Sequence, residues 1–217
     1  MAADNQVIWS VVIPVKVLAV AKSRLAGLRD ADRRALALAM AADTAQAAIA
    51  SPVVGGVVVV SDDPLVAAEV EAMGARVIAD SPAAGLNAAL AAGARHAEGW
   101  WPGRGVAGLL ADLPALRPEE LTAALTCAAT TEHGFVPDAE GTGTTLYAAR
   151  PGAAFTPSFG PGSRSLHAKA GATELPVPIG AGLRQDVDTL DDLRSAAAIG
   201  LGRRCAGLAL ETADGSR

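Results

Sequence analysis

The stretch Val7–Val15, V-I-W-S-V-V-I-P-V, determines the fold class that the sequence predicts. Its apolar and mostly β-branched residues are typical of a parallel strand that is buried on both faces of a sheet. An Ala- and Leu-rich helical pattern follows over Ala31–Ala50, and a second strand, rich in Val, follows over Val53–Val60. Because parallel strands need a crossover connection, usually a helix, this order indicates a βαβ unit.

The same alternation of strand and helix continues beyond the first unit. Asp63 and Pro64 predict the start of the next helix, because Asp is a favoured N-cap residue and Pro a favoured first helical residue. We therefore predict a single-domain α/β fold, a mostly parallel sheet with helices on both faces. The further elements expected are strands over Arg76–Ala79 and Gly105–Leu110 and helices over Pro64–Met73, Leu86–His96 and Pro118–Ala129.

The pattern changes after Thr131. Two short apolar runs, Gly134–Val136 and Thr144–Ala149, are separated by a Gly-rich loop, and the stretch Arg150–Ser165 is long, irregular and rich in Pro and Gly. A loop of this length within a compact domain is more often functional than idle. A closing helix is expected over Asp191–Ile199.

Length and composition limit the possible classes of protein. The 217 residues, 51% of them hydrophobic, are enough for one large core, and we expect one domain over residues 1–217, with a core over about 7–200 and a flexible tail over about 211–217. A net charge of −5 and an aromatic content of 3% argue against nucleic-acid binding. No apolar run is long enough to cross a membrane, and the first residues lack the basic region of a signal peptide. We therefore expect a cytoplasmic protein, with Cys127 and Cys205 as buried or incidental thiols.

Three basic residues, Lys16, Lys22 and Arg24, lie close together after the first strand. Ligands of open α/β sheets bind at the carboxyl ends of the strands, where this loop begins. Several cations at such a place suit a polyphosphate, because they can hold several phosphoryl oxygens at once. A solvated basic loop is the alternative, and the loop matches neither the phosphate-binding P-loop nor the dinucleotide-binding glycine motif.

Acidic residues mark two further positions. Asp112 follows the strand that ends near Leu110, and a carboxylate buried there needs a cationic partner or a metal. Asp186 and Asp188 lie on the same side of an extended segment, because side chains alternate along it. Two carboxylates from separate strand ends form a common Mg²⁺ site for phosphoryl chemistry. The alternative is helix capping: Asp112 lies too far before the helix at Pro118 to cap it, whereas Asp188 could cap the closing helix.

Two Gly-rich segments, Gly141–Thr145 and Phe159–Ser165, are further candidate binding loops. Glycines allow backbone amides to approach an anion closely, and Thr or Ser hydroxyls add donors. Ser163 also lies where a helix could start, and a helix N-terminus favours phosphate or carboxylate. Two ordinary turns are the alternative interpretation.

The sequence does not support zinc or serine-hydrolase chemistry. The histidines, His96, His133 and His167, are scattered and lack the spacing of zinc ligands. No serine lies in the G-x-S-x-G context that serine hydrolases of the α/β class need.

Five motifs occur in a fixed order between about Val7 and Gly200. They are V-K-x-x-x-x-A-K-S-R-L from Val15, D-L-P from Asp112, G-T-G-T from Gly141, F-G-P-x-S from Phe159 and D-V-D-T from Asp186. In this order and spacing the chain resembles the CofC/FbiD family, the guanylyltransferases of coenzyme F-420 biosynthesis. The resemblance is closest to the phosphoenolpyruvate guanylyltransferase branch.

The resemblance implies a nucleotidyltransferase fold of the glycosyltransferase-A-like kind, with GTP as a substrate and Mg²⁺ as the cofactor. The metal ligands of the family match Asp112 and Asp188. The contacts to phosphoenolpyruvate match Thr144, Gly160 and Ser163.

For the nucleotide, the resemblance implies that Lys16, Lys22 and Arg24 face the phosphates of GTP and neutralise the leaving pyrophosphate. Asn87 falls where the base or the ribose is held. Ala111 is a departure, since the family often has Gly before D-L-P. We expect its methyl group to tighten the approach to the nucleotide without abolishing binding.

The activity implied is transfer of GMP from GTP to the phosphate of phosphoenolpyruvate, with release of pyrophosphate. The product, enolpyruvoyl-2-diphospho-5'-guanosine, would pass to the next enzyme of coenzyme F-420 biosynthesis. Within the family the acceptor can instead be 2-phospho-L-lactate or a 3-phosphoglycerate-type acid. A non-catalytic nucleotide-binding module is the alternative from another class, and the presence of both Asp112 and Asp188 argues against it.

Overall fold

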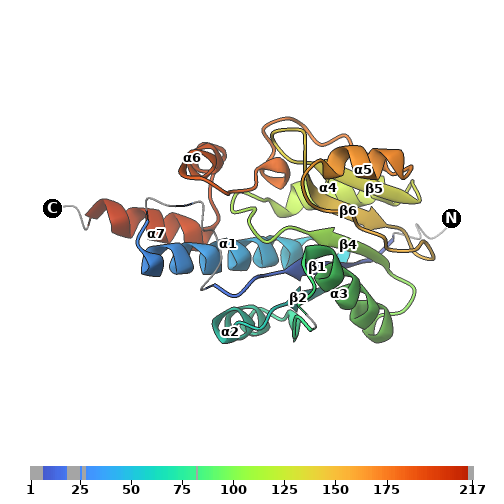
Figure 1. The fold of residues 1–217 in the computed structure, drawn as a ribbon, viewed down its shortest axis with the longest axis horizontal. Helices are drawn as coiled ribbons and strands as arrows, with labels where there is room; N and C mark the ends of the chain where they lie inside the picture. Colours follow the sequence, from blue (N-terminus) through green and yellow to red (C-terminus); the bar gives the residue numbers. More distant parts are fainter. Residues whose placement is uncertain (1–6, 19–24, 26–27, 82, 215–217) are drawn as a thin grey trace.

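The computed structural model describes residues 7–18, 25, 28–81 and 83–214 of the chain. Within these residues the strands form one seven-stranded sheet in the order β3-β2-β1-β4-β6-β5-β7. Helices lie on both sides of this sheet (Figure 1), which confirms the predicted α/β fold. The strands are β1 (Trp9–Pro14), β2 (Val54–Val60), β3 (Arg76–Ile78), β4 (Gly105–Leu109), β5 (His133–Pro137), β6 (Thr144–Ala149) and β7 (Thr173–Glu174).

All the described strands except β6 run in the same direction. β1 pairs in parallel with β2 and with β4, and β2 pairs in parallel with β3. β6 is antiparallel to both of its neighbours, β4 and β5, whereas β7 is parallel to β5. The first residue of β6, Thr144, therefore lies at the same sheet edge as the carboxyl ends of the other strands.

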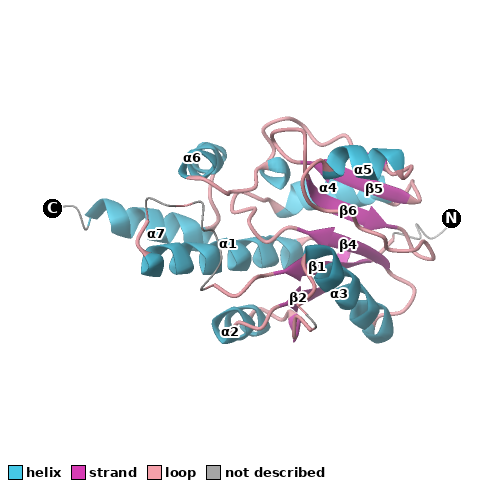
Figure 2. Ribbon diagram, in the orientation of Figure 1, coloured by secondary structure: helices cyan, strands magenta, loops and turns pink. Residues whose placement is uncertain are grey.

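The helices form a layer on each face of the sheet (Figure 2). They are α1 (Asp30–Ala50), α2 (Pro64–Ala72), α3 (Leu86–Trp100), α4 (Pro118–Ala128), α5 (Ser163–Lys169), α6 (Leu190–Ile199) and α7 (Arg203–Asp214), with a short 3-10 helix, η1 (Gly182–Arg184). Side chains of α1, α2 and α4 pack in one cluster with Val11 and Ile13 of β1. Side chains of α3 pack with Val12 on the opposite face, because neighbouring side chains of a strand point to opposite faces.

Helix α3 lies close to β1, and Gly93 makes this approach possible. A side-chain carbon at Gly93 would clash with Cγ1 of Val12. The small residue lets the backbone of the helix come down onto the sheet, so the apolar face of α3 packs tightly.

Helix α7 was not predicted from the sequence, and it extends into the stretch of about 211–217 where a flexible tail is expected. The helix continues to Asp214. Its first turn is fixed by α1, since the backbone amides of Arg204 and Cys205 donate to the buried carboxylate of Asp43 at 3.1 and 2.9 Å. A carboxylate beside the first amides of a helix stabilises it. Because Asp43 lies 161 residues before Arg204, local sequence patterns could not reveal this partner.

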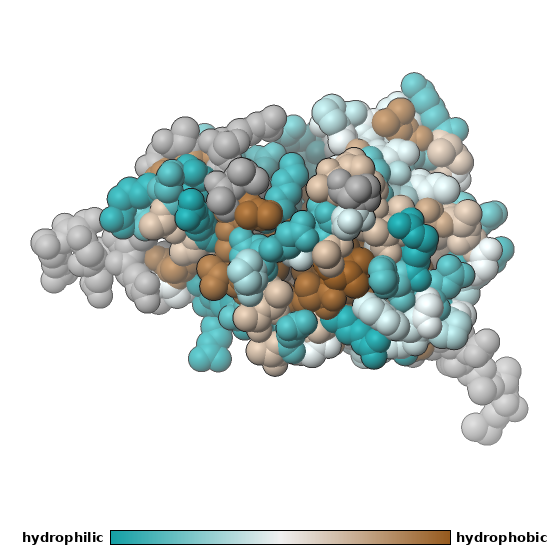
Figure 3. Space-filling model, turned by 60° about the horizontal axis from the view of Figure 1, so that its bottom comes forward, coloured by the Kyte–Doolittle hydropathy of each residue, from teal (hydrophilic) through white to brown (hydrophobic). Residues whose placement is uncertain are grey.

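Both cysteines are free thiols, half-buried at Cys127 in α4 and buried at Cys205 in α7. Among the helices that the structure describes, none is long and apolar enough to cross a membrane. On the face shown in Figure 3, apolar surface forms small patches among hydrophilic side chains.

Candidate active site

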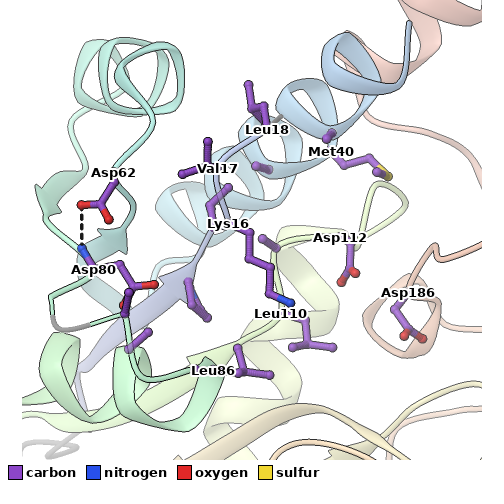
Figure 4. Close-up of a pocket in the computed structure, with 18 of the residues that line it drawn as sticks. Lys16, Val17, Leu18, Met40, Asp62, Asp80, Leu86, Leu110, Asp112 and Asp186 are labelled. Atoms are coloured by element: carbon purple, nitrogen blue, oxygen red, sulfur yellow. Dashed lines mark hydrogen bonds between the residues drawn. The ribbon is translucent and has the colours of Figure 1, made fainter. Parts of the chain in front are cut away.

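A cavity of about 710 Å³ opens at the carboxyl edge of the sheet, where β1 and β4 lie side by side. Met40 of α1 and Leu86 of α3 line it, so helices from opposite faces of the sheet border the same cavity. Such a point is the usual binding site of open α/β sheets. The charged residues that line it are Lys16, Asp62, Asp80, Asp112 and Asp186, which Figure 4 labels, and Asp188.

Four of these charged groups follow four neighbouring parallel strands. In the order of the sheet, Asp80 follows β3, Asp62 follows β2, Lys16 follows β1 and Asp112 follows β4. Figure 4 shows Asp62 and Asp80 on one side of Lys16, and Asp112 with Asp186 on the other. The cavity therefore has two separate acidic sides, with a lysine between them.

The two acidic segments that the sequence singled out meet in the structure. The backbone amide of Val187 donates to the carbonyl oxygen of Asp112 at 3.0 Å, and the Val187 side chain is fully buried. Asp186 and Asp188 flank this anchored residue, and both line the cavity with Asp112. The structure therefore brings these three carboxylates to one cavity, whereas the predicted role of Asp112 and Asp188 as Mg²⁺ ligands stays a prediction.

Helix capping is not the role of Asp188. The N-cap of α6 is Thr189, whose hydroxyl accepts a hydrogen bond from the Asp192 amide at 3.2 Å. The Asp192 carboxylate in turn accepts from the amides of Asp188 and Thr189 at 3.1 and 2.8 Å. The capping box therefore fixes the backbone of Asp188, while its side chain lines the cavity.

The turn that carries Asp112 is held from α1 by Thr44, which the sequence analysis missed. Its buried hydroxyl donates to the carbonyl oxygen of Ala111 and accepts from the amide of Leu113, both at 3.2 Å. These bonds hold the backbone on both sides of Asp112 and limit the directions in which its carboxylate can point. A threonine inside an Ala-rich helix is so common that its presence in the sequence does not indicate a contact with the Asp112 turn.

The carboxylates repel one another in this cluster, and together with burial the repulsion raises the pKa of Asp186. Burial, with a further contribution from the negative charges of Asp112, Asp138 and Asp188, raises the pKa of Asp186 to about 7. A bound cation would offset this repulsion. In the part of the chain that the structure describes, no three His, Cys, Asp or Glu side chains converge closely enough to hold a metal ion alone.

The basic loop is anchored at its base. The backbone amide of Leu18 donates to Oδ2 of the buried Asp63 at 2.9 Å, and Oδ1 of Asp63 caps α2 by accepting from Leu65 at 3.0 Å. Asp63 therefore has the predicted capping role and also fixes the segment that carries Lys16. Lys22 and Arg24 lie outside the described residues, and their contacts to phosphate remain predictions.

The predicted acceptor residues form a group beyond β4, outside the lining of the cavity itself. Thr144 and Ser163 are buried, and the Ser163 hydroxyl donates to Oγ1 of Thr144 at 3.0 Å. The backbone amide of Ser163 donates to the carbonyl oxygen of Gly160 at 3.0 Å. The start of α5 at Ser163 is confirmed, but in this structure its first amide is used within the protein.

The anion held by the Gly141–Thr145 loop is the chain's own Asp138. The backbone amides of Thr142 and Gly143 donate to its carboxylate at 2.9 and 2.7 Å. A side chain at Gly143 would clash with this carboxylate, which explains the glycine. The expectation that amides of this loop hold a ligand is therefore not met at these two positions. The sequence could not distinguish a bound anion from a nearby aspartate.

Asn87 contacts the second Gly-rich loop. Its side-chain Nδ2 donates to the carbonyl oxygen of Phe159 at 2.9 Å, and its Oδ1 accepts from the Phe159 amide at 2.8 Å. Both polar groups that we expected beside the base or the ribose therefore hold the backbone next to Gly160. The preceding residues Gly85 and Leu86, at the start of α3, line the cavity instead.

Comparison with known proteins agrees with this geometry. A family model described as a MobA-like NTP transferase domain matches residues 42–175. A protein of Thermomonospora curvata named phosphoenolpyruvate guanylyltransferase is 55% identical over 206 residues, which cover 95% of this chain and 90% of the relative. The chain belongs to the phosphoenolpyruvate guanylyltransferase family. This confirms the resemblance that the five motifs indicated.

Solved structures place the guanylyltransferase family within a wider fold group. A Desulfovibrio desulfuricans protein described as a nucleotide-diphospho-sugar transferase superposes with a TM-score of 0.71 at 16% identity, covering 95% of each chain. A Mycobacterium tuberculosis protein solved in complex with manganese superposes with a TM-score of 0.50 at 19% identity, covering 88% of this chain and 97% of the other. At these identities the likeness shows the fold alone, which is that of nucleotidyltransferases.

Proposed function

We propose that this protein transfers GMP from GTP to the phosphate of phosphoenolpyruvate and releases pyrophosphate. An acceptor phosphate oxygen attacks the α-phosphorus, and the bond between that phosphorus and the oxygen of the β-phosphate breaks. The product is enolpyruvoyl-2-diphospho-5'-guanosine, formed in the cytoplasm and passed to the next enzyme of coenzyme F-420 biosynthesis. No protein nucleophile is needed, because the acceptor is already an anion at neutral pH.

The observation that supports this most is the order of groups along the sheet edge. The acidic pair Asp62 and Asp80 lies on one side of Lys16, and Asp112 lies on the other, followed at the start of the next strand, β6, by Thr144. A nucleotide bound with its base near β3 and its phosphates near β1 would place its α-phosphorus between the lysine and Asp112. An acceptor held near Thr144 would then approach from the opposite side, as in-line displacement requires.

The acidic cluster fits a divalent cation, and we assign its ligands as Asp112 and Asp188. Mg²⁺ is commonly held by one or two carboxylates together with substrate phosphates, which suits a site whose described residues form no complete metal cage. When bound, the cation neutralises charge on the reacting phosphates. The chain contributes the fixed backbone at both ligands, through Thr44 around Asp112 and through Val187 and Asp192 around Asp188.

The basic residues complete the phosphate site. Lys16 extends into the cavity toward the side where Asp112 and Asp186 lie (Figure 4). With Lys22 and Arg24 from the same loop, it would neutralise the charge that develops on the leaving pyrophosphate. An ammonium group suits this role because it offers several donors to phosphate oxygens.

The acidic pair Asp62 and Asp80 accounts for a preference for GTP. Oδ1 of Asp62 accepts from the backbone amide of Asp80 at 3.1 Å, so the two strand ends are linked. Carboxylates accept hydrogen bonds only, and the Watson–Crick edge of guanine offers two donor groups. Adenine presents an acceptor at the equivalent ring nitrogen, which a carboxylate would repel.

The acceptor site comprises Thr144, Gly160 and Ser163. Thr144 contributes its hydroxyl, Ser163 supports that hydroxyl, and Gly160 exposes backbone that no side chain covers. A planar three-carbon acid with a carboxylate and a phosphate fits such a set of donors. An acceptor with a tetrahedral carbon, 2-phospho-L-lactate or a 3-phosphoglycerate-type acid, is the alternative within the same chemistry.

Pyrophosphate release tests the proposal directly. The purified protein is supplied with GTP and Mg²⁺ and with phosphoenolpyruvate, 2-phospho-L-lactate or 3-phosphoglycerate in turn. We expect the highest kcat/KM with phosphoenolpyruvate and no release without an acceptor. A higher value with another acid would reassign the acceptor, and no release with any of them would favour a non-catalytic nucleotide-binding module.

A further inference from the structure

His167 of α5 connects the acceptor loop with the start of β6. The ring is buried and makes two hydrogen-bond contacts through its nitrogens. The backbone amide of Ser158 donates to Nε2 at 2.9 Å, and Nδ1 lies 3.1 Å from Oγ1 of Thr144. The ring also stacks on Tyr147, with 4.6 Å between ring centroids, and meets Phe159 edge-on at 5.7 Å.

These contacts determine which ring nitrogen carries the proton. Nε2 accepts a hydrogen bond from Ser158, so it cannot itself carry a hydrogen on that side. The proton is therefore on Nδ1, and Nδ1–H donates to Thr144. Burial lowers the pKa of His167 to about 4, which keeps the ring neutral at physiological pH.

The tautomer in turn determines the direction of the Thr144 hydroxyl. Its oxygen accepts one hydrogen bond from Nδ1–H of His167 and a second from the Ser163 hydroxyl. A hydroxyl has two acceptor positions and one hydrogen, so both acceptor positions are filled. The hydroxyl hydrogen must point elsewhere, and among the described residues no hydrogen bond donated by Oγ1 of Thr144 is present.

We propose that His167 is a positioning residue that turns the Thr144 hydroxyl into a fixed donor for the acceptor molecule. By accepting a hydrogen bond from the amide of Ser158, His167 also fixes the segment before Gly160. Asn87 fixes the next residue of that segment, Phe159. His167 acts through these residues and does not touch the acceptor. The inference rests on the proposed function for the identity of the acceptor.

The first test separates acceptor binding from nucleotide binding. His167→Phe keeps an aromatic ring against Tyr147 and removes both hydrogen bonds. Because two modest hydrogen bonds are lost, we expect the KM for phosphoenolpyruvate to rise about 10–100-fold while the KM for GTP stays within about twofold. His167→Asn, whose amide can reach the position of Nδ1, is expected to recover part of the loss, whereas His167→Gln is not.

His133→Phe is the matched control. His133 also stacks on Tyr147, at 5.9 Å between ring centroids, and contacts a backbone carbonyl, that of Ala154 at 2.8 Å. Within the described part of the chain, His133 forms no hydrogen bond with Thr144 or Ser158, and we expect unchanged KM values for both substrates. Equal increases in KM for GTP and for the acceptor in His167→Phe, or an unchanged acceptor KM, would overturn the proposal.

A second measurement does not depend on activity. Long-range proton–nitrogen NMR correlations of the wild-type protein identify the protonated ring nitrogen, and we expect Nδ1–H with an unprotonated Nε2 at pH 7. A protonated Nε2 would overturn the proposal even if His167→Phe fails to fold. If no acid supports turnover, calorimetric binding of phosphoenolpyruvate to wild type and to His167→Phe still tests the inference, and equal affinities would refute it.

Discussion

The backbone amide of Val187 donates a hydrogen bond to the carbonyl oxygen of Asp112 at 3.0 Å. This bond joins the loop after β4 to the segment before α6, which are far apart in the sequence. Because Val187 is fully buried between Asp186 and Asp188, both carboxylates are fixed at the cavity by one apolar anchor. The acidic cluster therefore depends on backbone pairing as much as on the carboxylates themselves.

Loss of either proposed metal ligand should abolish most of the activity. Asp112→Asn and Asp188→Asn keep the size of the side chain but remove a negative charge that would hold the cation beside the phosphates in the cavity. We expect a loss of roughly 3 kcal/mol of transition-state stabilisation, or about a hundredfold in kcat, with thermal unfolding close to that of wild type. Asp191→Asn, an exposed change in α6, is the control. Near-normal turnover of either variant with Mg²⁺ would remove that residue from the metal site.

The acidic pair on the nucleotide side should control the choice of base. Asp62→Asn and Asp80→Asn each replace a pure acceptor by a group that also donates, so adenine is no longer repelled. We expect the ratio of kcat/KM for GTP to that for ATP to fall at least tenfold in one of the two variants. Glu71→Gln in α2 removes an equal charge away from the cavity lining and should leave the ratio unchanged. If both variants keep the wild-type ratio, the base is recognised elsewhere.

Two substitutions, one that alters the backbone and one that removes a hydrogen-bond donor, should each weaken binding of the acceptor. Gly160 has a φ of 131°, which L side chains rarely adopt, so Gly160→Val strains the loop and covers its backbone. Thr144→Val keeps the shape of the side chain and deletes its donor, at a cost of about 1–3 kcal/mol in acceptor binding. Steady-state kinetics should show a raised acceptor KM in both variants. A change confined to the KM for GTP would place the nucleotide, and not the acceptor, at these loops.

Stability should depend on pH through His167. Its pKa of about 4 in the folded protein lies below the ordinary value of 6.5, so the unfolded chain binds a proton more readily. The contribution of the neutral ring is complete above pH 6.5 and is lost as the pH falls toward 4. Urea unfolding at pH 7 and at pH 4.5 should show wild type losing about 2 kcal/mol more than His167→Phe, which cannot ionise. Parallel losses in the two proteins would contradict a buried neutral ring.

Much of the parallel part of the fold could be predicted because its signals are local. The β-branched run before Lys16 and the Asp63–Pro64 helix start both appear in the structure at the expected places. The reversal of β6 and helix α7 could not be predicted in this way. Both depend on partners far along the chain, β4 for the strand and Asp43 for the helix.

In the candidate site too, features with a local sequence signal could be predicted and features that depend on distant partners could not. Residue type and position after a strand were enough to single out Lys16 and Asp112, and the acidic pattern of residues 186–188 singled out Asp188, although no strand precedes it in the structure. The structure brings all three to one cavity. The groups that orient them were invisible, because a threonine such as Thr44 or a scattered histidine such as His167 has no distinctive spacing. A sequence motif indicates which groups face a ligand, whereas the contacts behind those groups arise only from the folded packing.

The reversal of β6 gives the two halves of the site different freedom to change. The half proposed to bind the nucleotide lies at the ends of parallel strands, and each connection between these strands contains a crossover helix. The acceptor half begins at Thr144, which is joined to β5 by the short hairpin connection 138–143. Insertions or exchanges in this hairpin would reshape the wall around the acceptor while the crossover helices stay in place. Changes in a single short turn would thus alter the proposed acceptor site without rebuilding the half that is proposed to bind the nucleotide.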